Sequence, residues 1–287
     1  MRPDAIIKTL EDAGFEARYV GGCVRDTLLD RPIHDWDIAS QALPEDVLRL
    51  FPHCVPTGIR HGTVTVLLDG VSAEVTTYRL DGAYHDGRHP DGVRFVRSLA
   101  EDLARRDFTI NAMMQDVLSG EIVDCWGGRE DLKRRIIRCV SEKTFPEDAL
   151  RVFRAAQFSA RFRAEIESET LELCREIDVS CVTHERVFEE MSKALLKADE
   201  PSIFFRALRR MNHLKEFFPE LQACIGVPQS PKYHPEGDVF EHTMLVIDCA
   251  AKLRARAVNP LGFMLSALFH DLGKVVATEI HEDGKIT

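Results

Sequence analysis

The sequence has no long apolar run and no closely spaced pair of cysteines. None of its segments approaches the length of a membrane span, and the first residues lack the apolar core of a signal peptide. The eight cysteines are scattered, and no two of them are spaced as C-x-x-C. That distribution argues against a zinc ribbon, a redox pair and a secreted disulfide frame, and it suits a reducing compartment. We therefore expect a cytoplasmic protein that has no membrane partner.

The chain also lacks an excess of basic residues. It carries 37 Lys and Arg against 47 Asp and Glu, which gives a formal net charge of -10. Any surface for a nucleic acid must therefore be local, with basic side chains clustered against an acidic background. With 45% hydrophobic and 29% charged residues the composition is that of a soluble globular protein, and 287 residues allow two or three domains.

The two halves of the chain differ in their hydrophobic pattern. Up to about residue 140, short runs rich in Val, Thr and Tyr alternate with stretches of helical spacing, whereas after about residue 145 only the helical spacing remains. We predict an α/β domain followed by a string of helices. The predicted strands are 15–22, 36–40, 62–68 and 73–80, and the predicted helices include 23–30, 43–51, 147–162, 186–198 and 203–218.

Three segments are expected to be irregular. The stretch "DGAYHDGRHPDG", residues 81–92, is rich in Gly, Asp and His and predicts a mobile loop. Residues 219–235 predict a joint within the helical half. The last residues, "IHEDGKIT", stop without a helix end, so we expect that the chain is cut there rather than finished.

Two aspartates, Asp35 and Asp37, are separated by one residue. On a strand this spacing points both carboxylates to one face, close enough to share a cation such as Mg²⁺. An isolated D-x-D is more often a solvated strand end with two surface acids, so the interpretation depends on what surrounds it.

The upstream segment "GGCVRD" favours a phosphate site. Gly21 and Gly22 let backbone N–H groups approach a phosphate, and a helix that begins near residue 24 offers its positive N-terminus. Arg25 could then add a bidentate phosphate contact. A Gly-Gly turn alone is weak evidence, because many turns from a strand into a helix use it for geometry only.

A third carboxylate could complete a metal pocket. In the alternating segment 73–79, Glu74 and Thr76 lie on one strand face and Val75 and Thr77 on the other. If this strand lies beside the one that carries Asp37, Glu74 can meet both aspartates. Taken alone, Glu74 fits a half-exposed strand surface equally well.

The segment "LARRDFTINAMM" adds further polar candidates. Arg106 suits a triphosphate, while Asp107 and Asn111, four residues apart on one face of a predicted helix, could address a ribose. The same residues also fit a solvated helix face.

In combination these motifs resemble the class II tRNA nucleotidyltransferase family, which contains the CCA-adding enzymes and the bacterial poly(A) polymerases. The resemblance covers nearly the whole chain, in the order "GGCVRD", "HDWD", "RRDFTINAM", "EDALRVFRA" and "HERVFEE". It implies an α+β fold whose nucleotidyltransferase head, residues 1–140, has a small mixed sheet with flanking helices. All-α neck and body regions, 141–225, and a further helical region, 226–287, would follow.

The resemblance also implies an activity, the template-free addition of C and A to the tRNA 3′ end from CTP and ATP. Asp35, Asp37 and Glu74 would be the catalytic carboxylates, and Asp35 and Asp37 would hold two Mg²⁺ (magnesium) ions. One ion would activate the 3′-hydroxyl and the other would steady the leaving pyrophosphate. Full CCA addition is the favoured hypothesis, and addition of the terminal A alone is the main alternative. A poly(A) polymerase and a silent tRNA-binding module are disfavoured, and the oligomeric state stays open.

Nucleotide choice is predicted to depend on Asp148, Arg151 and Arg154, whose spacing of three would place them on one helix face. Cytosine and adenine share an amino donor beside a ring-nitrogen acceptor, so Asp148 could accept from the former while Arg151 donates to the latter. Uracil and guanine present the opposite polarity and would leave buried charges unpaired. A surface ion pair is the plainer alternative. Family members commonly continue this stripe with an arginine, where this chain has Gln157.

The segments "HPEGDVFEHTMLV" and "ALFHDLGK" resemble an HD phosphohydrolase module. His242, His270 and Asp271 would then be ligands of a divalent transition metal. The HD family needs a further Asp well downstream, and the chain ends at Thr287, so we expect an incomplete, unoccupied site with weak or no activity. An HD-type metal-dependent phosphohydrolase with a degenerate head is the competing hypothesis from another class. Its hydrolysis would survive Asp35→Ala.

Overall fold

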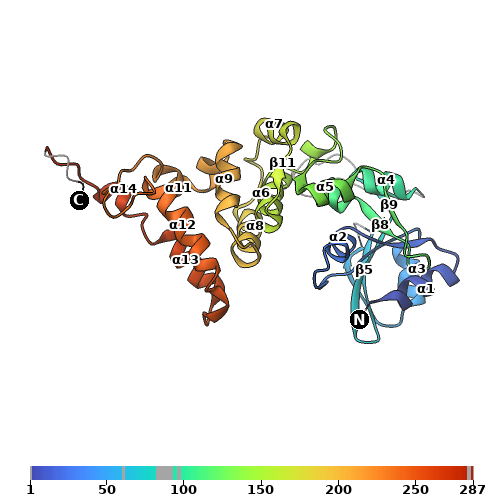
Figure 1. The fold of residues 1–287 in the computed structure, drawn as a ribbon. Helices are drawn as coiled ribbons and strands as arrows, with labels where there is room; N and C mark the ends of the chain where they lie inside the picture. The colour runs from blue at the N-terminus through green and yellow to red at the C-terminus, as the bar shows by residue number, and fades with distance from the viewer. Residues whose placement is uncertain (1, 60–61, 82–92, 96–97, 283–285, 287) are drawn as a thin grey trace. The chain divides into compact units, whose positions relative to one another are not determined.

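The computed structural model describes residues 2–59, 62–81, 93–95, 98–282 and 286 (Figure 1). The chain forms two compact units, Met1–Asp148 and Ala149–Thr287. Within the described residues, none of the helices is both long enough and apolar enough to cross a bilayer.

The first unit is built around a sheet of seven strands in the order β3-β4-β5-β2-β1-β8-β9. Strands β2 and β5 run parallel, whereas the other neighbouring pairs run antiparallel, so the sheet is mixed, as predicted. A separate pair, β6 (Arg79–Asp81) and β7 (Val93–Phe95), is antiparallel. The strands of the large sheet are β1 (Ala17–Val20), β2 (Asp37–Ser40), β3 (Cys54–Gly58), β4 (Thr63–Leu68), β5 (Val71–Thr77), β8 (Met113–Gln115) and β9 (Ile122–Asp124).

Helices cover this sheet because their apolar stripes match the apolar faces of its strands. Ile6, Ile7 and Leu10 of the first helix are fully buried in one cluster with Ile38 and Val75 of the two parallel strands. The unit also contains the short strand β10 (Ile136–Ile137). Its helices are α1 (Asp4–Asp12), α2 (Gly22–Leu28), α3 (Pro44–Leu50), α4 (Leu99–Ala104) and α5 (Gly128–Arg134), with single turns at η2 (Thr109–Asn111) and η3 (Phe145–Glu147).

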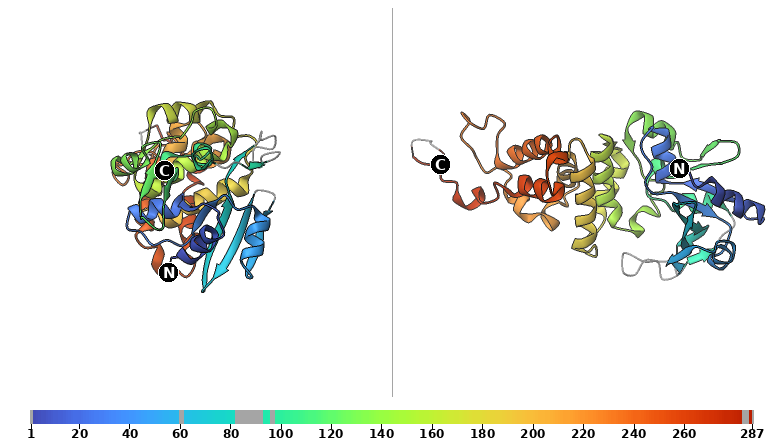
Figure 2. Two further views of the ribbon diagram at one scale, coloured as in Figure 1. Left: turned by 90° about the vertical axis from the view of Figure 1, so that its right-hand side faces the viewer. Right: turned by 90° about the horizontal axis from the view of Figure 1, so that it is seen from below.

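In the described part of the second unit the named elements are helices, apart from the two-residue strand β11 (Glu165–Ile166). Phe153 of α6 is fully buried and packs edge to face on Phe217, with ring centroids 4.9 Å apart. Helices α12 and α13 pack side by side (Figures 1 and 2). The helices are α6 (Leu150–Phe162), α7 (Ser168–Glu176), α8 (His184–Lys197), α9 (Ser202–Arg210), α10 (Leu214–Phe217), α11 (Pro219–Ala223), α12 (Val239–Ala251), η4 (Arg254–Arg256), α13 (Pro260–Phe269) and α14 (Lys274–Ala277).

The predicted elements are present, but several of their ends differ. Helix α2 begins at Gly22 rather than near residue 24, and β2 begins at Asp37, so Asp35 lies outside the strand because the chain is still turning there from α2 into the sheet. The predicted helix 203–218 is two helices, since Asn212 between them has a positive φ of 64° that a helix does not allow. Of the predicted loop 81–92, residues 82–92 lie outside the described residues. The three-part division at 140 and 225 stays a prediction.

Candidate active site

Asp37 and Glu74 are directly opposite each other in the parallel strand pair β2–β5. Glu74 donates its backbone N–H to the carbonyl of Trp36 at 2.8 Å, which fixes the register at the start of β2. The alternation of β5, with Ala73 and Val75 buried and Glu74 exposed, turns the glutamate away from the core. The structure therefore places Glu74 opposite Asp37, as the sequence analysis expected of this strand pair. The expected meeting with Asp35 and the role of Glu74 at a metal stay predictions.

Asp35 is held by its neighbour Trp36 although it lies outside the strand. Trp36 is buried and packs its ring against Tyr19 of β1, with centroids 4.9 Å apart. Asp35 itself is exposed. Because Trp36 is anchored in the core, the backbone on either side of it is fixed, and so are the positions of Asp35 and Asp37. The packing of a buried aromatic ring, rather than strand pairing, therefore positions Asp35.

The pKa of Asp37 is set by its burial and by the charged groups around it. Burial raises the pKa of Asp37 to about 6. The guanidinium of Arg106 opposes that shift, and the like charges of Glu74 and Asp35 add to it. Three acidic groups that repel one another around a partly buried centre form a set of hard oxygen donors, which is what a divalent cation such as Mg²⁺ requires.

Gly21 brings Arg106 against the same carboxylate. The backbone of Gly21 has a φ of 72°, and a β-carbon built there would lie 2.8 Å from Nη1 of Arg106 and 3.5 Å from Oδ2 of Asp37. Only glycine combines this backbone with so close an approach. The Nε atom of Arg106 is buried without a hydrogen-bond partner among the described residues, so the guanidinium has a donor that a ligand could use. Gly22 starts α2 and lies against Arg25, whose Nη2 is 3.5 Å from the place of its β-carbon.

Arg25 is committed to partners inside the protein. It is 4% exposed, and its Nε and Nη2 each donate to a carboxylate oxygen of Asp26 at 2.9 Å. Its Nη1 donates to Oδ1 of Asn111 at 2.5 Å, and Nδ2 of Asn111 donates to Oδ1 of Asp107 at 3.0 Å. The bidentate partner of Arg25 in this structure is thus a carboxylate of the next residue. The phosphate contact of Arg25 stays a prediction.

Asp107 and Asn111 meet, but not on an α-helix. Helix α4 ends at Ala104, and the single turn η2 (Thr109–Asn111) brings Asn111 back to Asp107. The prediction of one α-helical face is wrong because Asp107 also accepts from the N–H of Phe108 at 2.7 Å. A side chain that binds the next backbone N–H favours a turn over a helix.

Asp102 is a site residue that the sequence analysis missed. Its side chain is 1% exposed and accepts from Arg105 at 2.8 Å and from Arg106 at 3.3 Å. Burial alone would raise the pKa of Asp102, but the guanidinium groups of Arg106 and then Arg105 hold it below its usual value. Asp102 therefore anchors Arg106 beside Gly21. The spacing of four residues between Asp102 and Arg106 could have indicated this ion pair in the sequence.

The predicted nucleotide-selecting stripe is only partly on a helix. Helix α6 begins at Leu150, and Asp148 lies before it with an extended backbone, φ -123° and ψ 103°. The prediction that Asp148 shares the helix face is wrong, because the chain turns at η3 immediately before it. Arg151 is buried on α6, and Arg154 places its guanidinium 5.1 Å from the ring centroid of Phe158.

Gln157, which replaces a family arginine, is 2% exposed. Its Nε2 is buried without a hydrogen-bond partner. The residue thus packs in the interior around α6.

The predicted HD-type ligands lie together in the second unit. Oδ2 of Asp271 is 3.6 Å from Nε2 of His242 and 3.2 Å from Nε2 of His270. One ligand atom from each of the three lies within 4.8 Å of the others. A second group, His234, Glu236 and His242, meets the same criterion. Sequence analysis missed His234 and Glu236, although both stand in the segment "HPEGDVFEH" that pointed to His242.

Comparison with known proteins decides the family. The Poly A polymerase head domain matches residues 17–138, and the probable RNA and SrmB- binding site of polymerase A matches residues 165–225. The crystal structure of the Bacillus stearothermophilus CCA-adding enzyme in complex with CTP is 30% identical, with a TM-score of 0.67 over 96% of this chain and 83% of that chain. The chain belongs to the class II tRNA nucleotidyltransferase family.

Other members of the family extend this comparison. The CCA-adding enzyme of Lactobacillus helveticus is 52% identical over 192 residues, which are 66% of this chain and 48% of the relative. That of Leuconostoc mesenteroides is 49% identical over 215 residues, 73% of this chain and 53% of the relative. A tRNA nucleotidyltransferase complexed with a primer tRNA and an incoming ATP analog is 25% identical, with a TM-score of 0.66 over 93% of this chain and 75% of that chain. The chain spans about half the length of the curated relatives it matches.

Proposed function

We propose that this protein is a tRNA nucleotidyltransferase that adds the 3′-terminal C and A residues from CTP and ATP without a nucleic-acid template. The observation that carries the proposal is the pairing of Asp37 with Glu74 across β2 and β5, with Arg106 packed on Gly21 beside them. Relatives that are 49–52% identical are CCA-adding enzymes, which supports this activity.

The carboxylates suit two Mg²⁺ ions. Asp35 and Asp37 would hold the ions, which supply activation of the tRNA 3′-hydroxyl and neutralisation of the leaving pyrophosphate. Glu74 contributes the third acidic group from the neighbouring strand and raises the pKa of Asp37 by its charge. The chain's own part is to hold the three acidic groups on adjacent backbone segments.

The triphosphate is assigned to the turn between β1 and α2. There, Gly21 and Gly22 remove side chains from the surface that faces Arg106. Arg106, held by Asp102, would neutralise phosphate charge with its buried and unpartnered Nε. The network from Arg25 through Asn111 to Asp107 would brace this turn, with the ribose nearby.

Nucleotide selection is assigned to Asp148, Arg151 and Arg154. A carboxylate that accepts from an exocyclic amino group and a guanidinium that donates to a ring nitrogen would select both C and A. Arg151 is buried, so an unpaired partner would be costly there.

The experiment uses three tRNA transcripts, ending at the discriminator base, after -C-C and after -C-C-A. Each is incubated with Mg²⁺ and labelled CTP or ATP and resolved at single-nucleotide length. Stepwise gain of C, C and A by the first transcript supports the proposal. Growth of the -C-C transcript alone, by one A, would make the protein an A-adding enzyme, and a long tail on -C-C-A would indicate a poly(A) polymerase.

A second assay separates the HD-type phosphohydrolase alternative. Hydrolysis of phosphate esters that is unchanged in Asp35→Ala, without incorporation of any nucleotide, would replace the proposal with that activity. The convergence of His242, His270 and Asp271 is the observation that keeps this alternative in view.

A further inference from the structure

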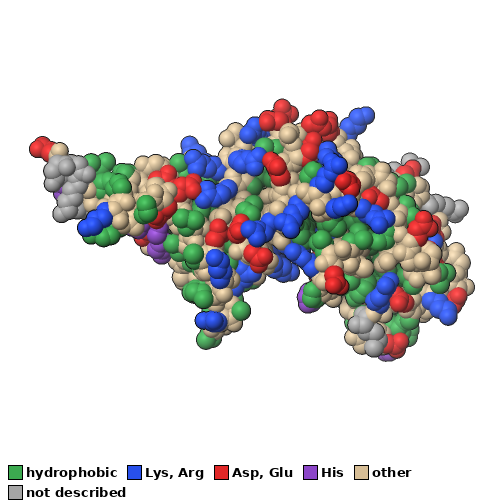
Figure 3. All heavy atoms as spheres, in the orientation of Figure 1, with side chains coloured by type: hydrophobic (Ala, Val, Ile, Leu, Met, Phe, Trp, Pro, Cys, Tyr) green, Lys and Arg blue, Asp and Glu red, His purple; other side chains and the backbone are tan. Residues whose placement is uncertain are grey.

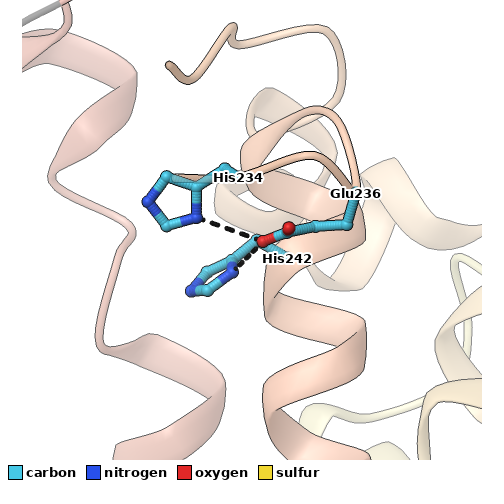
Figure 4. A group of neighbouring side chains, drawn as sticks. All are labelled: His234, Glu236 and His242. Carbon is cyan, nitrogen blue, oxygen red and sulfur yellow. Dashed lines mark hydrogen bonds and ion pairs between the residues drawn. The ribbon is translucent and has the colours of Figure 1, made fainter. Parts of the chain in front are cut away.

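Glu236 joins two histidines on the side of His242 that faces away from Asp271. Oε1 of Glu236 lies 3.1 Å from Nδ1 of His234 and 2.6 Å from Nδ1 of His242 (Figure 4). His242 stands on α12, whereas His234 and Glu236 belong to the segment that leads into this helix. The other ring nitrogen of His242 points to Asp271. His242 therefore lies between two carboxylates, one at each nitrogen.

The partners of these rings decide which nitrogens carry hydrogen. A carboxylate only accepts, so the bond to Glu236 places the hydrogen of a neutral His242 on Nδ1. In His270, Nδ1 lies 2.8 Å from the carbonyl oxygen of Ala267, which also only accepts. Both neutral rings therefore present the lone pair of Nε2 toward Asp271.

Three acceptors thus converge without a hydrogen between them. Nε2 of His242, Nε2 of His270 and Oδ2 of Asp271 face one another, with the two histidine nitrogens 3.6 Å and 3.2 Å from the carboxylate oxygen. Two ligands about 2.1 Å from a tetrahedral metal ion are roughly 3.4 Å apart, so these distances suit a shared ion. Lys274 donates to the same oxygen at 2.7 Å and so favours the ionised carboxylate. This donor binds Asp271 and not the lone pair of Nε2 in either ring.

We propose that Glu236 is a positioning residue for a divalent transition-metal site formed by His242, His270 and Asp271. By accepting from Nδ1 of His242, the carboxylate fixes the ring orientation and its tautomer and makes Nε2 a stronger ligand. His234 donates to the same oxygen and holds Glu236 in place. The site is at the surface, where Figure 3 shows histidine side chains gathered beside α12, so an ion can enter from solvent.

The proposal is tested by measuring Co²⁺ binding to the purified 287-residue chain. Calorimetry gives the affinity, and the visible absorption of bound Co²⁺ reports its ligands. All buffers contain millimolar Mg²⁺, added to keep the proposed carboxylate site of the first unit from taking up Co²⁺. The sequence analysis expected an unoccupied site, but the three donors converge without the further downstream Asp, so we expect the wild type to bind with a spectrum of nitrogen-ligated Co²⁺. Asp271→Asn should bind much more weakly. Glu236→Ala should weaken binding by about 10–100-fold. Glu236→Gln should fall between, because its amide oxygen still accepts from Nδ1 but carries no charge.

The matched control is Glu220→Ala, which removes an exposed carboxylate from α11 of the same unit and should leave binding unchanged. Circular dichroism establishes that each variant is folded. Equal Co²⁺ affinity in wild type and both Glu236 variants would overturn the proposal, as would no Co²⁺ binding by the wild type. Binding that survives Asp271→Asn but is lost in Glu236→Gln would place the ion among His234, Glu236 and His242 instead, which also contradicts the positioning role.

Discussion

Arg106 lies against Gly21 so closely that a β-carbon at residue 21 would stand 2.8 Å from its Nη1. Gly21→Ala should therefore move Arg106 and strain a backbone that has a φ of 72°. We expect a loss of about 1–3 kcal/mol of unfolding free energy, measured by denaturant titration, and a large loss of nucleotide incorporation.

Gly14→Ala is the matched control for this variant. Gly14 has a φ of 89°, but nothing lies within 4 Å of the place of its β-carbon. It should lose stability through backbone strain and keep its activity. Equal losses of activity in both variants would mean that the contact between Arg106 and Gly21 is unimportant.

Asp37 should make the metal-free protein less stable as the pH rises. Its pKa is raised from 3.8 to about 6, so the folded state binds more protons than the unfolded state between these values. The stability that protonated Asp37 contributes is fully present below about pH 4 and is lost as the pH rises through 6.

Denaturant titrations in EDTA between pH 4 and 8 should measure this effect as roughly 1–3 kcal/mol. Asp37→Asn should lack that part of the pH dependence and should gain less stability from added Mg²⁺ than the wild type does. The same pH dependence in both proteins would contradict the assignment of the raised pKa to Asp37.

Asp102→Asn should release Arg106 from its anchor. The side chain is 1% exposed and binds two guanidinium groups, so removing its charge takes an ionic partner from both of them in a largely buried site. We expect a loss of about 3 kcal/mol in unfolding free energy and a raised KM for nucleotides. Because the pKa of Asp102 is lowered by folding, its stabilising effect should be present above its usual pKa and fall away at lower pH. Nucleotide affinity equal to that of the wild type would show that Arg106 does not need this anchor.

Arg151→Ala should relax the choice of nucleotide. Loss of the guanidinium removes the donor for the ring nitrogen of C and A, so the preference for CTP over UTP should fall by about 10²-fold or more. Single-nucleotide extension of a transcript with each of the four nucleotides measures this preference. Arg161→Ala, at the last turn of the same helix, is the control and should keep the wild-type order. An unchanged preference in Arg151→Ala would remove Arg151 from nucleotide selection.

The sequence predicted the meeting of Asp37 and Glu74 because period-two alternation fixes which strand residues share a face. It could not place Asp35, since its position depends on Trp36 packing against Tyr19, a contact between distant segments. The internal use of Arg25 was equally hidden. The spacing of residues does not predict whether the guanidinium of Arg25 faces a ligand or binds Asp26, because that choice depends on how the side chains pack in the folded protein.

The histidine cluster shows the same limit. His242, His270 and Asp271 were predicted as ligands from two motifs, and the structure brings them together. Glu236 was missed because its role depends on the direction in which the ring of His242 points, and spacing alone does not give that direction.

Single-turnover addition of A to a -C-C transcript measures whether the carboxylates of β2 and β5 are needed for nucleotidyl transfer. Asp37→Asn and Glu74→Gln are compared with Glu121→Gln, which alters an exposed glutamate of the same unit. We expect the rate to fall about 10³-fold or more in Asp37→Asn and clearly in Glu74→Gln, with unchanged tRNA binding in both, and to stay at the wild-type value in Glu121→Gln. A wild-type rate in Asp37→Asn would show that Asp37 does not take part in nucleotidyl transfer.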